Sequence, residues 1–502
     1  MGIRRIATRE GRHVVGSRGL PLGGLWSRMR ASTTARMLLA QPHTKARFDL
    51  FAIGTRRSHV PFVAEELSYW SDLDENVIGV VFRDRIDNDY GWSLMVRDRL
   101  RRFRGVHLNV SVRSERRAEA ELRQKIANVS QNTNLEELGV QGDETNSATD
   151  LLTVLPSTRP DQLHPYFLEL VNRPGRLPAR AVLSEIGPWL TIADPHFVKE
   201  FQRHQFDQRL WELYLWAALR EGGYDVTINE APDFLCWAPD AAFTVEATTV
   251  APSKDGVLAQ HPEPRTPEEL EAFQEGYMAI KYATPLTNKL TRRSAIGRAY
   301  WEEDAAVGLP FVIAISDFHK AATKDDLGSM TYSQSAIWRY LYGITATWEF
   351  VDGQLIIEQQ RIASHFYCGK TIESGFFYMP GAENVSAVLF SNAGTIAKFD
   401  RIGVVAGYGA PDHKYVRVGF RFNPDPNAVM GTRFVEDVCD EGYRERWGDE
   451  LQVFHNPRAV HPLPHQCFGG LQQHYLEDGQ LKTYYADEAV ISSFTIIFQP
   501  TD

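Results

Sequence analysis

The first part of the chain alternates between apolar runs typical of strands and one polar-faced helical segment. The segments NVIGVVFRDR, GWSLMVRD and FRGVHLNVSV predict strands, and ERRAEAELRQKIANV predicts a helix. The run from Val60 to Trp70 predicts a further helix. Together these segments indicate a small α+β domain at residues 38–127.

Polar residues dominate the stretch that follows. Residues 128–160 are rich in Asn, Thr, Ser and Gly and poor in aromatic residues, which is typical of a linker. A domain boundary is therefore expected there, with a larger domain at 161–502.

Within that larger domain the pattern predicts helices, a hairpin and later strands. Helices are expected near 162–172, 194–221 and 267–303, and a hairpin at 233–250. The segment PFVIAISDF predicts a strand. Beyond residue 330 the strand-like segments are ATWEFVDGQLIIEQQRI, VSAVLFSN, KYVRVGFRF, LQVFH and SSFTIIFQ. We expect VSAVLFSN and LQVFH to join the sheet of the larger domain.

Composition narrows the class of protein. The chain has 502 residues, of which 43% are hydrophobic and 24% charged, and charges interrupt every apolar segment long before the eighteen or so residues of a membrane span. The four cysteines form no CxxC pair, so neither a disulfide framework nor a zinc knuckle is indicated. We expect a cytoplasmic protein without a membrane partner.

The net charge of −10 would repel a nucleic acid at long range, so any such partner must meet local basic patches. Residues 1–47 are rich in arginine and contain a single acid, Glu10. They resemble a transit peptide in composition, but we favour an upstream-extended start, with Met29 or Met37 opening the protein. Residues 1–37 are therefore expected to form a disordered basic leader outside the fold.

A second basic patch lies in the turn expected between two strands of the small domain. It consists of Arg97, Arg99, Arg101, Arg102 and Arg104. These side chains could bind phosphates, but a solvated turn is the interpretation we favour.

The expected hairpin carries the strongest chemical signal. Its centre, Ala238-Pro239-Asp240-Ala241, suits a type I turn, because proline presets φ at the second position. A symmetric hairpin about this turn places Asp233 opposite Glu246, with Cβ atoms about 5 Å apart on one face. Two such carboxylates repel unless a cation lies between them, and Mg²⁺ or Mn²⁺ suits oxygen ligands of this kind.

These residues, together with a glutamate in the preceding helix, resemble the PD-(D/E)XK nuclease superfamily. The matching elements are Glu212, Pro232-Asp233 and Glu246-Ala247-Thr248, within a region of about 200–320. The flanking segments RLWELYLWAAL, PFVIAISDF and HNPRAVHPL also resemble large uncharacterised bacterial proteins associated with this superfamily.

The resemblance implies an α/β protein with a restriction-endonuclease-like mixed sheet flanked by helices, a core at 195–325 and a strand-rich C-terminal extension. It implies a Mg²⁺-dependent (or Mn²⁺-dependent) endonuclease that hydrolyses phosphodiester bonds, with DNA favoured over RNA, in bacterial defence or DNA processing. Asp233, Glu246 and Glu212 would hold the metal.

The chain departs from the superfamily pattern at Thr248, where a lysine is expected. A hydroxyl cannot supply the positive charge that orients the attacking water. In some members of the superfamily the lysine comes from the following helix, which here offers Lys289, our first choice, and Lys281. The same basic stretch ends in three arginines that could contact phosphates: Arg292, Arg293 and Arg298.

Each assignment has an alternative. Glu212 could mark the solvent edge of an apolar helix, and the basic stretch could be a solvated face. The domain could be a catalytically silent nuclease fold that binds nucleic acid or protein, or a structural protein in which the hairpin acids are incidental. A lysine amine near the carboxylate pair would favour the enzyme over both alternatives.

Histidines supply two weaker signals. The segment HNPRAVHPLPH contains His455, His461 and His465, but its prolines indicate an irregular loop rather than a metal site. Asp317 and His319 end a buried-looking strand and could serve as a peripheral ligand or proton-transfer pair, with a strand-end cap as the favoured reading.

Overall fold

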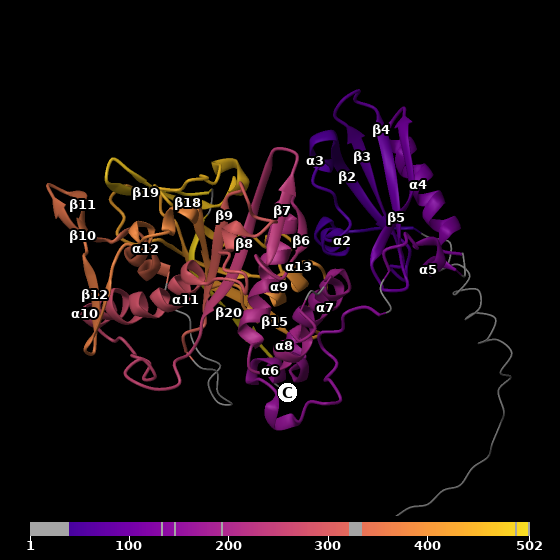
Figure 1. Cartoon of the computed structure of the whole chain (residues 1–502). Coiled ribbons are helices and arrows are strands. Elements are labelled where there is room, and N and C mark those ends of the chain that lie inside the picture. Colours follow the sequence, from indigo (N-terminus) through magenta and orange to yellow (C-terminus); the bar gives the residue numbers. More distant parts are fainter. Residues whose placement is uncertain are drawn as a thin grey trace, which may run out of the picture.

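The computed structural model describes residues 40–131, 134–144, 147–191, 194–320, 334–486 and 489–499. The expected basic leader at 1–37 lies outside these residues. Among the helices of the described ranges, none has both the length and the apolar character needed to cross a membrane. The described chain is a mixed α/β protein with sheets and helices (Figure 1).

The N-terminal part is a five-stranded sheet in the order β1-β2-β3-β4-β5 with helices on its faces. One face packs on α4 through Leu122 and Ile126, and the other packs on α2 through Phe48 and Phe51. Its elements are β1 (Gln41–Pro42), α2 (Lys45–Ala52), α3 (Val60–Val63), β2 (Ala64–Ser71), β3 (Val77–Asp84), β4 (Tyr90–Arg97), β5 (Phe103–Val112), α4 (Glu115–Val129) and α5 (Leu135–Leu138). The three strands and the long helix expected here are confirmed.

The helix expected from Val60 to Trp70 is wrong beyond its first turn. Residues Ala64–Ser71 form strand β2, which pairs antiparallel with β3 across almost its whole length. Backbone hydrogen bonds to β3 decide the structure of this segment, because a local apolar pattern is a weaker determinant than sheet pairing.

The arginine-rich turn after β4 is only in part the solvated turn that we expected, since Arg99 and Arg101 alone among its five arginines are exposed. Arg97, Arg102 and Arg104 are buried, and each forms an ion pair. Arg97 binds Glu185 of a helix in the second part of the chain, and Arg102 binds Asp98. Carboxylates of the protein itself therefore occupy these three guanidinium groups, and the Arg97–Glu185 pair joins the first domain to the second.

The second part of the chain is built on an eight-stranded mixed sheet in the order β19-β18-β17-β14-β9-β8-β7-β6. The central strands β8, β9 and β14 are parallel, β7 runs antiparallel to both of its neighbours, and β17 runs antiparallel to β14 but parallel to β18. The strands are β6 (Asp225–Ile228), β7 (Phe234–Ala238), β8 (Ala241–Val250), β9 (Phe311–Asp317), β14 (Ala387–Ser391), β17 (Gln452–His455), β18 (Gln472–Glu477) and β19 (Gln480–Tyr484). The expected recruitment of VSAVLFSN and LQVFH to this sheet is confirmed.

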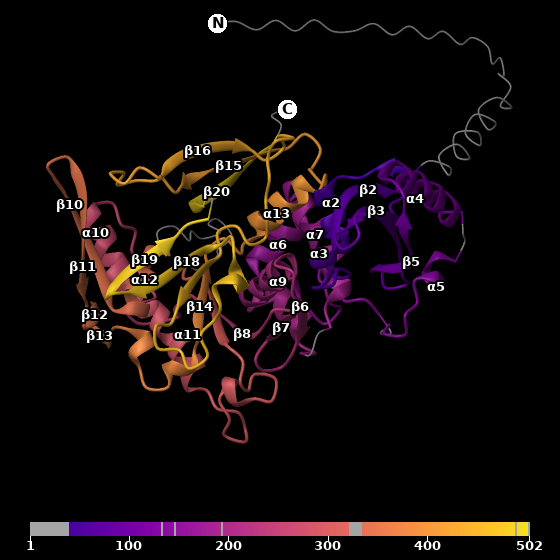
Figure 2. The same cartoon turned by 90° about the horizontal axis from the view of Figure 1, so that it is seen from above.

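Helices cover both faces of the central sheet (Figures 1 and 2). Alternate residues of β9 show the division, since Val312 and Ala314 face one core and Ile313 and Ile315 face the other. The first core is closed by α6 (Pro165–Asn172), α7 (Leu177–Ile186), α8 (Phe197–Gln202), α9 (Phe206–Glu221) and α13 (Ile396–Val405). The second is closed by α10 (Pro267–Ala272), a π-helical segment (Phe273–Met278), α11 (Ala279–Thr291) and α12 (Gln334–Tyr342).

Two expected helices have different limits in the structure. The helix predicted at 194–221 is divided into α8 and α9 at Arg203–Gln205, and the helix predicted at 267–303 ends at Thr291. After Thr291 the chain makes turns and a short 3₁₀ helix at Tyr300–Glu302. Arg293 and Arg298 therefore follow the helix instead of lying on it.

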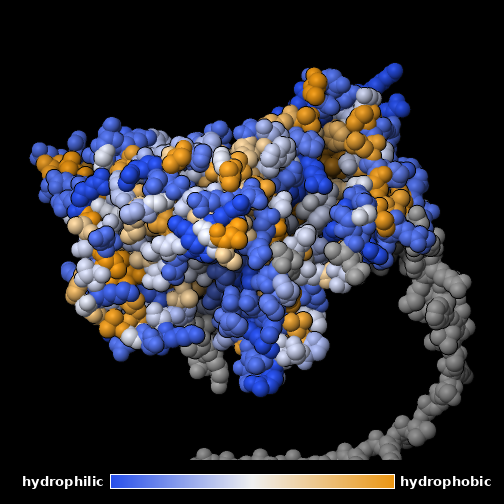
Figure 3. All heavy atoms as spheres, in the orientation of Figure 1, coloured by the Kyte–Doolittle hydropathy of each residue, from blue (hydrophilic) through white to orange (hydrophobic). Residues whose placement is uncertain are grey.

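A third sheet and two hairpins complete the fold. The third sheet has the order β16-β15-β20 and lies beside α13 (Figure 2). The elements are β10 (Ile344–Val351), β11 (Gln354–Arg361), β12 (Ser364–Tyr367), β13 (Lys370–Glu373), β15 (Lys414–Arg421), β16 (Thr432–Asp437) and β20 (Val490–Phe498). The β10–β11 hairpin extends at the end of the molecule opposite the first domain and exposes Trp348 and Phe350, and apolar atoms are visible there in Figure 3.

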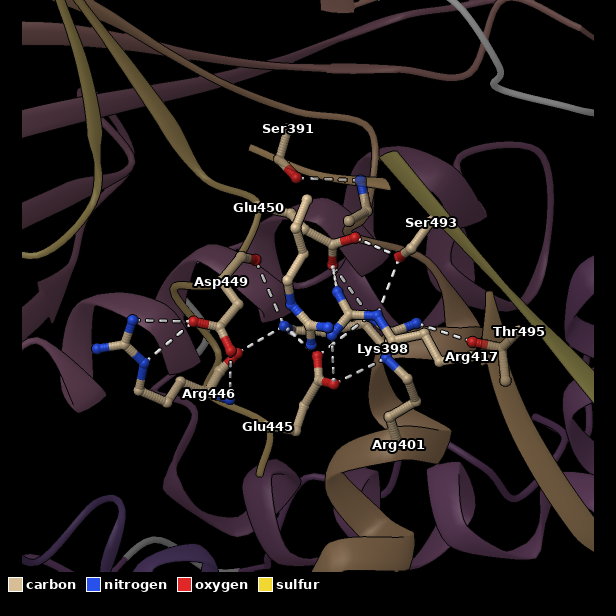
Figure 4. Close-up of polar contacts among 12 residues, drawn as sticks. Ser391, Lys398, Arg401, Arg417, Glu445, Arg446, Asp449, Glu450, Ser493 and Thr495 are labelled. Carbon is tan, nitrogen blue, oxygen red and sulfur yellow. Dashed lines mark hydrogen bonds and ion pairs between the residues drawn. The ribbon is translucent and has the colours of Figure 1, made fainter. Parts of the chain in front are cut away.

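A buried network of charges joins the third sheet to α13 (Figure 4). Lys398 and Arg401 of α13 and Arg417 of β15 all bind Glu445, at 2.5, 2.9 and 3.2 Å. Arg401 and Arg417 also bind Glu450, at 3.1 and 2.9 Å. Three cations thus share two carboxylates away from water, where a charge without any partner would be strongly unfavourable.

Candidate metal and phosphodiester site

The hairpin has the register that the sequence predicts. Trp237 pairs with Ala242 and Leu235 pairs with Thr244, around a turn at Pro239-Asp240. Counted from the turn outward, the last regular pair is Phe234↔Val245, next to Asp233. The next position in the same register is Asp233 opposite Glu246, as expected.

Side chains and backbone tie Asp233 and Glu246 together. The backbone N–H of Asp233 donates to Glu246 Oε2 at 3.2 Å, and the backbone N–H of Ala247 donates to Asp233 Oδ2 at 2.7 Å. Among the described residues, Asp233 Oδ1 has no hydrogen-bond donor. The hairpin therefore fixes both carboxylates in place and leaves one oxygen of Asp233 for another ligand.

Lys289 places a positive charge beside the hairpin carboxylates. Its Nζ lies 2.5 Å from Glu246 Oε1, because α11 packs across the face of β8 on which Glu246 lies. Burial by itself would lower the pKa of Lys289, but the carboxylates of Glu246 and Asp233 raise it above the ordinary value. The ammonium group is therefore charged at neutral pH and lies beside the carboxylate pair.

Lys281, the second lysine considered, lies elsewhere. Its Nζ donates to the backbone oxygen of Ala251 at 2.6 Å and to Ser253 Oγ at 2.9 Å, beyond the end of β8. Burial lowers the pKa of Lys281 to about 8. The two lysines lie two turns apart on α11, and of the two only Lys289 is ion-paired to a hairpin carboxylate.

Glu212 comes from α9 and approaches the pair from the other side of the hairpin. Arg209 binds its Oε2 at 2.9 Å, and Gln208 donates to its Oε1 at 2.8 Å. Both of its oxygens thus have donors on the same helix. The sequence analysis did not include Arg209 and Gln208 in the site. Their spacing of three and four residues from Glu212 could have predicted the contact, since residues at this spacing are neighbours on a helix.

Burial and nearby negative charge act on two of the three acids. Burial, together with the charges of Glu246 and Glu212, raises the pKa of Asp233 well above its ordinary value. Burial also raises the pKa of Glu212, with a further contribution from Glu246 and opposition from Arg209. Burial is the larger cause in both, and a bound cation would offset the smaller contribution of the neighbouring carboxylates.

The three acids do not form a tight cage. In a tight cage, three acidic, His or Cys side chains have ligand atoms within 4.8 Å of one another. Among the described residues, only Asp84, Asp87 and Asp89 meet this condition. Those three lie at or near the exposed β3–β4 turn, where backbone N–H groups already bind Asp84 and Asp87. In the hairpin site, Asp233 and Glu246 are consequently the candidate direct ligands, and Glu212 would act through water.

Tyr300 is a further neighbour that the sequence analysis did not predict. Its hydroxyl lies against Glu246, and its pKa is raised to about 12 by burial and by that carboxylate. The 3₁₀ helix after α11 brings it there, and the guanidinium group of Arg292 packs over its ring at 4.4 Å.

The three candidate phosphate-binding arginines have partners within the protein. Arg292 is 3.6 Å from Glu303, and Arg298 is 2.6 Å from the exposed Asp304. Arg293 donates to the backbone oxygens of Leu290 and Arg292. Arg298 and Asp304 are both solvent-accessible, so a phosphate could replace the carboxylate at Arg298 with little cost.

The histidines of the HNPRAVHPLPH segment do not converge. His455 ends β17 and is buried, with Nε2 2.8 Å from Gln473 Oε1 and its ring stacked on Tyr475. His465 Nδ1 lies 3.1 Å from the hydroxyl of the same tyrosine. These contacts belong to sheet packing and give no metal site.

No family model, no curated protein and no solved structure matches this chain.

Proposed function

We propose that this chain is a metal-dependent nuclease with a restriction-endonuclease-like fold, and that Asp233, Glu246 and Lys289 form its catalytic centre. The observation that carries the proposal is the ion pair between Lys289 and Glu246, next to Asp233. A lysine from the following helix thereby replaces the missing charge at Thr248.

The donor set fits Mg²⁺ or Mn²⁺. Both candidate ligands are carboxylates, and Asp233 Oδ1 has no donor among the described residues. When bound there, such an ion would lower the pKa of a water molecule and neutralise charge on a phosphodiester. The chain would hold it through Asp233 and Glu246, with Glu212 reaching it through water.

The protein groups would divide the remaining work. Lys289 would orient the attacking water and stabilise charge on the phosphate, and Arg209 would keep Glu212 ionised. Arg298 and Arg292 would contact the backbone of the nucleic acid by exchanging Asp304 and Glu303 for phosphate. DNA is the proposed substrate, in the bacterial cytoplasm, in defence or DNA processing.

A second candidate function is a silent nuclease fold that binds without cutting. The observation in its favour is that Lys289 and Arg209 already neutralise Glu246 and Glu212. The test of both is a cleavage assay on single- and double-stranded DNA and on RNA, with Mg²⁺, with Mn²⁺ and with a chelator. Metal-dependent cleavage that Asp233→Asn abolishes supports the enzyme, and intact substrates in all conditions support the silent fold.

A further inference from the structure

Two histidines outside the carboxylate site face each other at the end of β9. His319 follows the strand directly, and His261 comes from the loop between β8 and α10. Their Nε2 atoms lie 2.7 Å apart, and their rings are almost parallel, at 14°. The sequence separates the two residues by 58 positions, so the fold alone brings these nitrogens together.

The other nitrogen of each ring, Nδ1, lies near a carboxylate. His319 Nδ1 lies 2.6 Å from Asp317 Oδ1, which also accepts the backbone N–H of His319 at 3.1 Å. His261 Nδ1 lies 3.4 Å from Glu263 Oε1. Because a carboxylate accepts hydrogen bonds, His319 Nδ1 carries the proton and the neutral ring presents a lone pair at Nε2, whereas His261 Nδ1 makes no hydrogen bond within the described residues.

In the metal-free protein, His261 can donate its Nε2–H to the Nε2 lone pair of His319, and the two rings are then joined by a hydrogen bond of 2.7 Å. Loss of this one proton would leave two Nε2 lone pairs directed at the same point. A metal ion that displaces the proton would therefore meet two imidazole ligands that the fold has already brought together.

We propose that His261 and His319 bind a Zn²⁺ ion, or a similar late first-row transition-metal ion, through their Nε2 atoms. Neutral imidazole is a preferred ligand of these ions and not of Mg²⁺. Metal-binding histidines commonly donate their other N–H to a carboxylate, which fixes the ring and its tautomer. Asp317 has this relation to His319, and Glu263 lies 3.4 Å from Nδ1 of His261.

The surroundings fit an open site. His319 is buried beneath the rings of Phe273 and Tyr277, whereas His261 is partly accessible and Glu263 is exposed. With Zn–N distances of about 2.0–2.1 Å and tetrahedral angles, the two nitrogens would lie about 3.3 Å apart. The His261 loop would thus move by roughly half an ångström, and solvent would supply the remaining ligands.

The experiment titrates Zn²⁺, and separately Co²⁺, into the full chain carrying Asp233→Asn and Glu246→Gln, so that the hairpin carboxylates do not contribute. We expect about one equivalent of Zn²⁺ by calorimetry, visible absorption from Co²⁺, and no effect of Mg²⁺. Adding His261→Ala should weaken Zn²⁺ binding at least tenfold, and Asp317→Asn should weaken it by about 10–100-fold because His319 loses its orienting carboxylate.

His204→Ala is the matched control, since His204 is an exposed histidine of the same chain. His261 lies in a loop, so its removal tests the site even if His319→Ala fails to fold. Unchanged Zn²⁺ affinity after His261→Ala would overturn the proposal. So would the absence of Zn²⁺ binding together with an NMR signal from one proton shared by the two rings.

Discussion

Lys289 and Glu246 are 43 residues apart in the chain, yet Nζ of one lies 2.5 Å from Oε1 of the other. Neither residue could meet the other without α11 crossing the face of β8. The pair places a fixed positive charge beside two carboxylates whose spacing is set by a hairpin, and the functional proposal depends on that combination.

The first prediction concerns this lysine. Lys289→Ala should lower DNA cleavage by at least about 100-fold, because the charge that orients water and phosphate is lost. Mg²⁺ binding should remain or strengthen, since Glu246 loses its competing partner. Single-turnover cleavage and calorimetry on the same protein measure the two effects.

Lys281→Ala is the matched control, because Lys281 lies on the same helix but binds Ala251 and Ser253. It should leave cleavage within a few-fold of wild type. Equal loss in both variants would assign the effect to the helix instead of to the Lys289 charge.

The second prediction concerns the ion. Asp233→Asn combined with Glu246→Gln should abolish Mg²⁺ and Mn²⁺ binding and leave a folded protein. Both changes preserve shape and remove repulsion between buried carboxylates. In wild type, added Mg²⁺ should raise the melting temperature with a dependence on its concentration. Binding that survives in the double variant would contradict the proposed ligands.

The third prediction is a pH dependence. Because burial and neighbouring carboxylates raise the pKa of Asp233, the folded state binds a proton that the unfolded state has already released. The contribution of this residue to stability is therefore largest below the ordinary aspartate pKa and is lost as the pH rises toward the raised value.

The measurement is the free energy of unfolding of metal-free wild type and of Asp233→Asn, by urea titration between pH 4 and 8. As the pH rises, the free energy of unfolding of wild type should fall relative to that of Asp233→Asn. Saturating Mg²⁺ should remove this pH dependence from the comparison. A difference that is constant with pH would show that Asp233 is ionised without penalty.

The fourth prediction concerns the charge network at α13. Glu445→Gln leaves Lys398, Arg401 and Arg417 with a single buried carboxylate, Glu450, and should cost about 3–5 kcal/mol of stability. Arg417→Met should cost less, because it leaves two cations with two carboxylates. Chemical denaturation measures the stability lost in each variant. A larger loss in Arg417→Met than in Glu445→Gln would show that the balance of charges does not govern this network.

The sequence predicts the hairpin site well for a physical reason. A two-residue turn at Pro239-Asp240 fixes which residues pair, and the parity of a strand then fixes the face on which Asp233 and Glu246 lie. The choice of Lys289 over Lys281 follows less directly, since it depends on where α11 crosses β8. The sequence alone could rank the two lysines but could not position the helix.

Other features depend on contacts that a local pattern does not contain. Strand β2 forms at Ala64–Ser71 because β3 pairs with it, and Arg97 is buried because Glu185, far along the chain, neutralises it. His261 gave no signal, since it lies in a polar loop and acquires its partner only through the fold. Long-range pairing is the information that such sequence patterns lack.

The strand order of the central sheet has a consequence for how the protein is made. Strand β9 lies between β8 and β14, and β14 in turn pairs with β17. During synthesis the apolar edge of β9 therefore stays uncovered until Ala387–Ser391 has left the ribosome, and the edge of β14 until Gln452–His455 has followed. A fragment limited to residues 195–325 would carry Asp233, Glu246 and Lys289 but would expose the unpaired edge of β9, whose first five residues are apolar. We expect such a fragment to aggregate, so the carboxylate site can mature only after most of the chain has been translated.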